Sequence, residues 1–101
     1  MKTSDSRLNN YVIAWRRRIH ASPELSFSEV LTAKAIAAEL RRLGWQVKTL
    51  AGGTGVVGLL KGGTPGRTVA LRADMDALPV QEENRVPYRS KVPGRMHACG
   101  H

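Results

Sequence analysis

The sequence predicts an α/β domain in which two helices precede about three strands and a long loop. Two observations carry this prediction. Apolar residues recur at three- and four-residue spacing in two stretches between residues 8 and 43, which is the helical period. From Trp45 onwards they alternate with polar residues, which is the strand period. Because such elements bury their apolar sides as layers, we expect the helices to cover one face of a mixed sheet.

The first predicted helix runs from about residue 8 to residue 19. Its apolar residues form one stripe that we expect to be buried, and Pro23 prevents any continuation beyond His20. Three consecutive arginines, residues 16–18, lie among apolar neighbours. We interpret them as the solvated face of an amphipathic helix. The stripe consists of Leu8, Tyr11, Val12, Trp15 and Ile19.

The second predicted helix follows residues 26–29, which have the Ser-x-x-Glu form of a capping box. In that motif Ser26 and Glu29 would satisfy backbone N–H groups left unpaired at the helix start. Gly44 offers the left-handed conformation that commonly closes a helix. The expected apolar stripe consists of Val30, Ala33, Ala37, Leu40 and Leu43, with Ile36 beside it.

Three strands are expected after the second helix, and their connectors are rich in glycine. The connector at residues 62–66 also contains proline, so we expect the second and third strands to form a hairpin around it. Neither this connector nor residues 52–55 match a phosphate-binding loop that leads into a helix, so both are interpreted as turns. Residues 80–94 are polar and interrupted by prolines, which predicts mostly loop. The expected strands comprise residues 45–50, 56–60 and 67–73.

Length and charge limit the classes of protein. The chain has 101 residues, a formal net charge of +8 and one cysteine. No apolar stretch approaches the roughly 20 residues that cross a bilayer. A polar N-terminus and a lone cysteine, which cannot form an internal disulfide, favour a cytoplasmic location. The charge raises a small basic nucleic-acid-binding module as the alternative function, although the five aromatic residues do not interleave with the basic ones.

Two clusters of residues could carry chemistry. Asp74 and Asp76 lie at the end of the third expected strand, where residues two apart face the same side. Ligands of open α/β sheets bind beyond such strand ends, but an aspartate pair can also simply cap loop N–H groups. Cys99 and His101 carry the thiolate and imidazole that zinc and similar ions prefer, and His97 is a further candidate. Two ligands do not complete a metal site, and a small buried apolar role for Cys99 is the competing interpretation.

Five motifs stand in the order expected of one enzyme family. Through them the chain resembles, from about residue 11 onwards, the N-terminal part of the binuclear-metal amidohydrolases. That family includes hippurate hydrolase, N-acyl-amino-acid amidohydrolases and indole-acetyl-amino-acid hydrolases. The resemblance implies a two-domain hydrolase whose catalytic α/β domain is interrupted by a smaller domain that often forms a dimer. The motifs are residues 17–25, 32–37, 52–58, 71–79 and 96–101.

The resemblance also implies roles for individual residues. Two divalent ions (Zn, Mn, Ni or Co) would activate a water that cleaves the amide between an acyl group and an amino acid. Cys99 and His101 match two metal ligands of the family, and Asp76 matches the strand-end aspartate that orients the metal centre. Asp74 stands where the wider superfamily has a ligand histidine, so we expect Asp74, like His97, only to support the site.

The resemblance further predicts a partial catalytic domain. The family's catalytic Glu-Glu pair and its remaining ligands lie downstream of the Cys-Gly-His motif. Glu82 and Glu83 precede that motif and lie in the loop, so they are not expected to be the catalytic pair. We expect residues 1–101 to be a truncated metallopeptidase-like domain without the small dimerisation domain, and inactive alone. The complete enzyme would act on N-acyl-amino acids as a homodimer; a further hypothesis is that the chain complements or regulates an intact paralogue.

Overall fold

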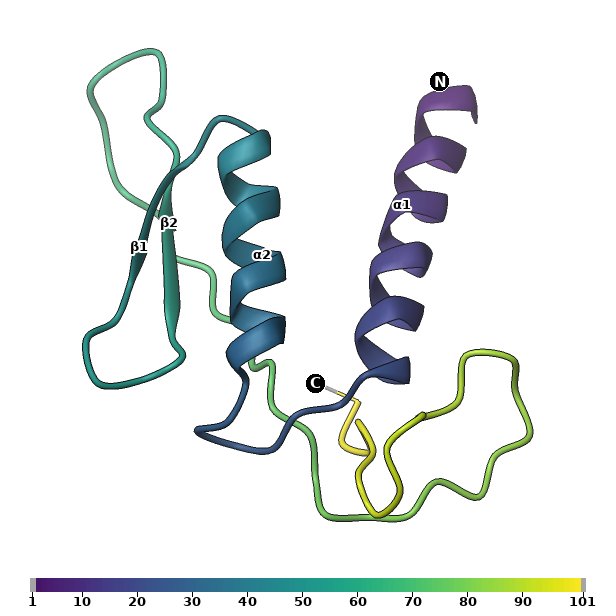
Figure 1. Cartoon of the computed structure of the whole chain (residues 1–101). Coiled ribbons are helices and arrows are strands. Elements are labelled where there is room, and N and C mark those ends of the chain that lie inside the picture. The colour runs from purple at the N-terminus through teal and green to yellow at the C-terminus, as the bar shows by residue number, and fades with distance from the viewer. Residues whose placement is uncertain (1, 101) are drawn as a thin grey trace.

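The computed structural model describes residues 2–100 and the side chains of residues 5–100. Two helices, α1 (Lys2–Ala21) and α2 (Val30–Arg42), precede two strands, β1 (Gln46–Thr49) and β2 (Val56–Leu59). Figure 1 shows the helices side by side, both strands on the side of α2 away from α1, and the later part of the chain looping beneath the helices. The predicted α/β class is confirmed.

Helix α1 begins earlier, and is far more exposed, than its apolar pattern predicts. Leu8 is 61% exposed and Val12 is 54% exposed, while Trp15 and Ile19 are half-buried. The predicted buried stripe is therefore wrong for the N-terminal half of the helix. An apolar stripe is buried only where a second layer lies against it, and in Figure 1 α1 stands apart from α2 along most of its length.

The start of α2 is capped from outside the predicted capping box. Glu24 Oε1 accepts hydrogen bonds from the Thr32 backbone N–H and from Thr32 Oγ1, both at 2.6 Å, and its Oε2 accepts from the Leu31 N–H at 3.1 Å. Glu29 is the N-cap residue, but its side chain makes no capping hydrogen bond. The predicted box of Ser26 and Glu29 is wrong because Glu24 already pairs the N–H groups that such a box would leave free.

Strands β1 and β2 form one antiparallel hairpin, in which Gln46 pairs with Leu59. Its turn includes Gly52 with a φ of +75°, as expected for the turn at residues 52–55. The hairpin predicted around residues 62–66 is wrong, because residues 67–73 do not pair with β2.

The hairpin packs against α2 through a position without a side chain. A Cβ atom added to Gly58 would lie 3.1 Å from Leu40 Cδ1 and 3.1 Å from Trp45 Cε3. Glycine therefore lets β2 approach the helix closely. Among the described residues, α2 packs on the hairpin and α1 does not pack closely on it, whereas both helices were expected to cover the sheet.

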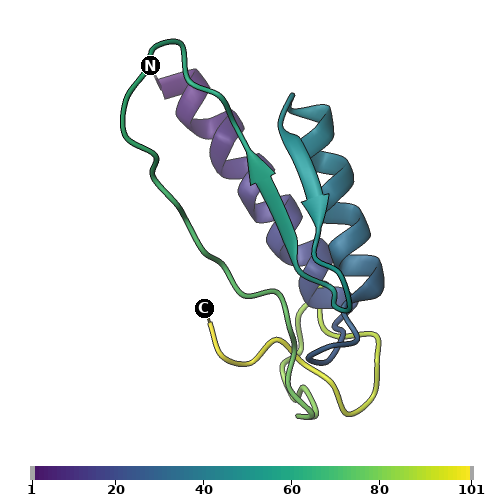
Figure 2. The ribbon, with the colours of Figure 1, turned by 90° about the vertical axis from the view of Figure 1, so that its left-hand side faces the viewer.

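Residues 67–73 were expected to form a third strand, but they are extended without a partner. Val69 is 83% exposed and Leu71 is 95% exposed. Within the described chain, no backbone–backbone hydrogen bond involves this segment. Figure 2 shows it running separately from the hairpin. An alternating pattern predicts strand conformation but does not supply a neighbour, so the sheet has two strands and is antiparallel, not mixed.

Apart from Pro23, in the turn between the helices, the buried apolar residues of the described chain are alanines. Ala33 and Ala37 lie on α2, and Ala77 lies where the chain returns beneath it, its N–H donating to the Glu24 carbonyl at 2.8 Å. This contact brings the segment after Asp76 against the turn between the helices. No helix in residues 2–100 is both long and apolar enough to span a membrane.

Candidate metal centre

Two segments that carry candidate site residues lie side by side beneath the helices. The Leu78 N–H donates to the Met96 carbonyl at 2.9 Å, and the Met96 N–H donates to the Leu78 carbonyl at 3.0 Å. These bonds form an isolated antiparallel bridge. Because the segments run in opposite directions, the residues before Leu78 lie beside those after Met96. Asp76 and Cys99 thus belong to neighbouring segments.

The His97 side chain joins these two segments. Its ring is hydrogen-bonded to the Asp76 backbone, and its Nε2 atom is buried with no hydrogen-bond partner among the described residues. Burial, followed by the nearby His20, holds the pKa of His97 below its usual value. A neutral imidazole presents one nitrogen that can accept a hydrogen bond or bind a metal ion.

The aspartates border an open hollow of about 420 Å³. Residues 73–76 line it together with the turn at residues 50–55 and Phe27. Asp74 Oδ1 lies 3.0 Å from Arg72 Nη2, and Asp76 is half-buried. Both aspartates line the same hollow, although the chain before them is not a strand of the sheet.

The remaining candidate ligands are at the end of the sequence. Cys99 is exposed and carries a free thiol, whereas His101 lies outside the described residues. Among residues 2–100, no three histidine, cysteine, aspartate or glutamate side chains gather closely enough to hold a metal ion. A thiol, a carboxylate and an unpaired imidazole nitrogen are nevertheless the donors that such ions prefer. The region therefore offers donors of the kind that a divalent metal binds.

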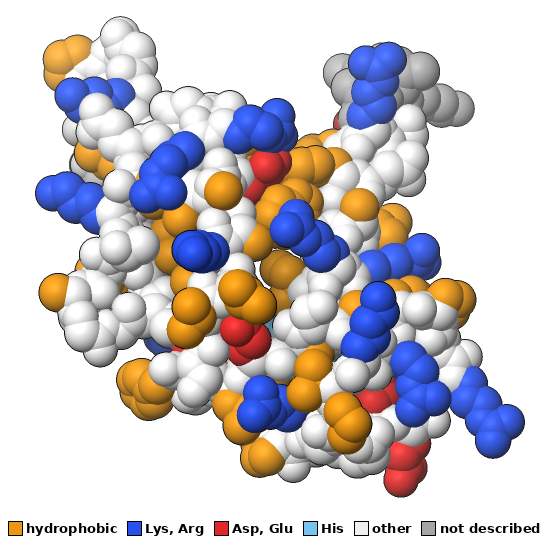
Figure 3. Space-filling model, in the orientation of Figure 1, with side chains coloured by type: hydrophobic (Ala, Val, Ile, Leu, Met, Phe, Trp, Pro, Cys, Tyr) orange, Lys and Arg blue, Asp and Glu red, His pale blue; other side chains and the backbone are white. Residues whose placement is uncertain are grey.

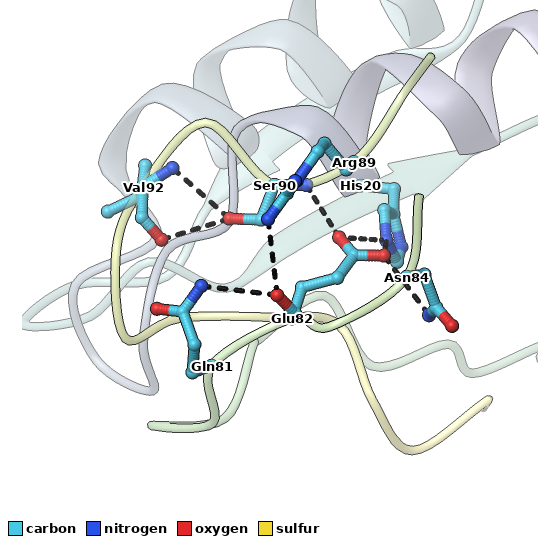
Figure 4. Close-up of polar contacts among 7 residues, drawn as sticks. All are labelled: His20, Gln81, Glu82, Asn84, Arg89, Ser90 and Val92. Atoms are coloured by element: carbon cyan, nitrogen blue, oxygen red, sulfur yellow. Dashed lines mark hydrogen bonds and ion pairs between the residues drawn. The ribbon is translucent and has the colours of Figure 1, made fainter. Parts of the chain in front are cut away.

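A buried ion pair beside this region was not singled out by the sequence patterns (Figure 4). His20 Nε2 lies 2.9 Å from Glu82 Oε1 and 3.1 Å from Glu82 Oε2. The Ser90 N–H donates to Oε1 at 2.6 Å, and Asn84 Nδ2 donates to Oε2 at 3.2 Å. His20 is 7% exposed and Glu82 only 2%, whereas Glu83 is exposed. No local pattern marks such a pair, because its two members are 62 residues apart in the sequence.

Hydrogen bonding keeps the Glu82 carboxyl ionised. The Ser90 N–H, with further contributions from His20 and Asn84, lowers its pKa to about 2 despite its burial. An ionised carboxylate with this many partners is a fixed part of the fold.

The consecutive arginines of α1 each lie over an aromatic ring. The guanidinium carbon of Arg17 is 4.6 Å from the centre of the Tyr88 ring, and that of Arg16 is 5.6 Å from it. Arg18 lies 5.0 Å from the centre of the Trp15 ring. Figure 3 shows lysine and arginine side chains spread over the visible face and not gathered into one patch. On this face they form no continuous track of the kind that a phosphate backbone needs.

The comparisons with known proteins agree with the geometry. The sequence model of "Peptidase family M20/M25/M40" matches residues 70–101, which include both neighbouring segments. The fold matches that of Bacillus subtilis YXEP, described as a dinuclear metal binding peptidase from the M20 family. The two share a TM-score of 0.87 and 41% sequence identity over 95% of this chain and 27% of that one. The chain is similar to peptidase family M20/M25/M40, which confirms the predicted resemblance to metal-dependent hydrolases.

Similar proteins carry several hydrolase names. The chain is 51% identical, over its whole length, to thermostable carboxypeptidase 2 of Saccharolobus solfataricus, of which it covers 26%. It is 54% identical to an N-acyl-L-amino acid amidohydrolase of Geobacillus stearothermophilus, over 89% of this chain and 24% of the relative. With the hippurate hydrolase of Campylobacter jejuni it shares 52% identity over 85% of this chain and 22% of the relative. The chain thus spans about a quarter of the length of these relatives, and none of their names points to nucleic acid.

Proposed function

We propose that the chain forms part of the catalytic domain of a metal-dependent amidohydrolase. The complete enzyme would cleave the amide bond of N-acyl-amino acids such as hippurate. The observation that carries this proposal is the antiparallel bridge at Leu78 and Met96, which puts the segment of Asp76 beside the segment of Cys99. The family, and the amidohydrolases among its members, supply the reaction class.

Two divalent ions (Zn, Mn, Ni or Co) would be held partly by Cys99 and His101, with Asp76 orienting the centre. When bound, such ions would supply polarisation of the scissile carbonyl and a lowered pKa of the water. The exposed Cys99 thiol offers the soft ligand. His97, tied to the Asp76 backbone, and Asp74 would support the site without binding the metal.

Activity requires more than these residues. Since no three donors gather among residues 2–100, we propose that the chain alone does not hydrolyse hippurate or N-acetyl-amino acids. The general base and the remaining ligands would come from the rest of the enzyme, which would also carry a small dimerisation domain. A reducing cytoplasm suits the free Cys99 thiol.

A chimera tests the proposal. In it, this chain replaces the matching quarter of the Bacillus subtilis YXEP protein, with which it shares its fold. We expect metal-dependent hydrolysis of N-acetyl-amino acids or hippurate, reduced to background by Cys99→Ala and by Asp76→Asn. Glu83→Gln, at an exposed position, is the matched control and should retain activity. A folded, metal-loaded chimera whose turnover survives Cys99→Ala contradicts the proposed site.

A further inference from the structure

We propose that His20 and Glu82 are positioning residues, whose buried pair holds the segment of His97 and Cys99 in place beside Asp76. This inference rests on the proposed function for its consequence at the metal centre. Neither residue is exposed enough to touch a substrate, so both must act through the residues they hold.

The pair is fully engaged with the fold. Both oxygens of Glu82 have donors within 3.2 Å, from His20, Asn84 and the Ser90 backbone. The Glu82 carbonyl also accepts a hydrogen bond from Gln81 Nε2 at 3.2 Å. A buried, fully hydrogen-bonded pair tolerates few alternative arrangements once its partners are fixed. These contacts therefore fix the position of the loop at residues 80–94 against α1.

Further contacts fasten the same loop to the last turns of α1. The Lys91 N–H donates to the Ala21 carbonyl at 2.9 Å. The Tyr88 ring meets the His20 ring edge-on, with 6.0 Å between their centres, and Arg17 covers Tyr88. The loop therefore packs against the last turns of α1.

From His20 the contacts continue to the candidate metal centre. The centres of the His20 and His97 rings are 6.4 Å apart. His97 is bonded to the Asp76 backbone and precedes Cys99 by two residues. Loss of the Glu82 contact releases the His20 ring, and with it one side of the space that His97 occupies. The Cys99 thiol then no longer has one fixed position relative to Asp76.

Cobalt binding to the 101-residue chain tests the consequence at the metal centre. Co²⁺ is titrated into the chain while the absorption of the thiolate–cobalt bond is recorded, and Cys99→Ala identifies that absorption. We expect Glu82→Gln and His20→Phe to weaken cobalt binding by about 10- to 100-fold, as loss of a supporting contact does at metal sites. Glu83→Gln should bind as the parent does, and His20→Gln, which keeps a donor near the Nε2 position, should restore part of the affinity. Equal affinity for the parent and Glu82→Gln overturns the inference.

Amide hydrogen exchange tests the positioning itself, without metal. We expect Glu82→Gln to accelerate exchange of the Leu78 and Met96 amides, whereas the Ala37 amide of α2 should exchange as in the parent. Unchanged exchange at Leu78 and Met96 overturns the inference, and acceleration at all three amides shows general unfolding and overturns it as well. A parent chain without Cys99-dependent cobalt absorption contradicts the proposed metal site instead, and the exchange result then decides the positioning role alone.

Discussion

Glu24 shows how a single side chain can start a helix from several residues away. Its carboxylate accepts hydrogen bonds from the first free N–H groups of α2 and from the Thr32 hydroxyl. Partial burial opposes ionisation, but the bonds from Thr32 and Leu31 outweigh it and hold the pKa of Glu24 below its usual value. A negative charge at this end of a helix is also favoured by the helix dipole.

Substitutions of Glu24 and Ser26 distinguish the cap made by Glu24 from the predicted capping box. Glu24→Ala should lower the free energy of unfolding by about 1 kcal/mol, because it leaves N–H groups at the start of α2 unpaired. Ser26→Ala should have almost no effect. Urea unfolding followed by far-UV circular dichroism measures both, and an equal loss in the two variants would show that Ser26 caps the helix after all.

The pH dependence of the free energy of unfolding tests the hydrogen bonds of Glu82. The pKa of Glu82 is about 2 in the folded chain against an ordinary 4.5, so its ionised form stabilises the fold above about pH 4.5. That contribution is lost as the pH falls from 4.5 towards 2. Glu82→Gln should therefore flatten the dependence of unfolding free energy on pH across this window, while Glu83→Gln keeps the parental slope. Parallel curves for the parent and Glu82→Gln, in denaturant titrations at each pH, would contradict the assignment.

At the scale of elements, the contact between α2 and the hairpin depends on Gly58. The backbone of β2 lies close enough to Leu40 and Trp45 that a β-branched side chain cannot fit between them. Gly58→Val should lower the free energy of unfolding by about 1–3 kcal/mol through overpacking. Gly53→Val, where a Cβ meets nothing within 4 Å, should stay within about 0.5 kcal/mol of the parent. Thermal unfolding of both variants makes the comparison, and similar losses would show that the strain is not local to the α2 contact.

The elements that the sequence predicts well are those decided by neighbouring residues. Both helices and the first two strands follow from local apolar periods, and the left-handed Gly44, with a φ of +89°, closes α2 as expected. The capping box failed because Glu24, which lies outside the motif, pairs the N–H groups at the start of α2. The third strand failed because pairing depends on a neighbour and not on the alternation of Val69 and Leu71 themselves.

The same distinction applies to the candidate site. Asp76 and Cys99 could be proposed from residue type, spacing and resemblance, and the bridge at Leu78 and Met96 places their segments together. The pair of His20 and Glu82 could not be proposed, because two residues far apart in the sequence form no local pattern that would indicate a contact.

As a whole, the molecule is open. Its radius of gyration is 15.6 Å, against about 13 Å for a compact domain of 100 residues. Large apolar side chains remain exposed on both helices, on β2 and along residues 67–73. An extended, unpaired segment with exposed apolar residues is a template for pairing with another chain.

We therefore expect the 101-residue chain to self-associate as its concentration rises. The double variant Val69→Ser, Leu71→Ser should shift association to higher concentration, because it removes the apolar residues of the unpaired segment. Phe27→Ser removes an 88% exposed apolar side chain elsewhere and should leave association close to that of the parent. Sedimentation velocity over a concentration series measures the association of the parent, the double variant and Phe27→Ser. If the double variant and Phe27→Ser reduce association equally, the unpaired segment is not its specific cause.

The contacts between the loop at residues 80–94 and the end of α1 also have a consequence for folding during translation. A ribosome releases the chain from its N-terminus, so α1 emerges long before the loop that carries Glu82 and Lys91. When that loop emerges, His20 and the Ala21 carbonyl are already available on a completed helix. The segment with Cys99 follows that loop in the chain and thus docks onto a surface that already exists.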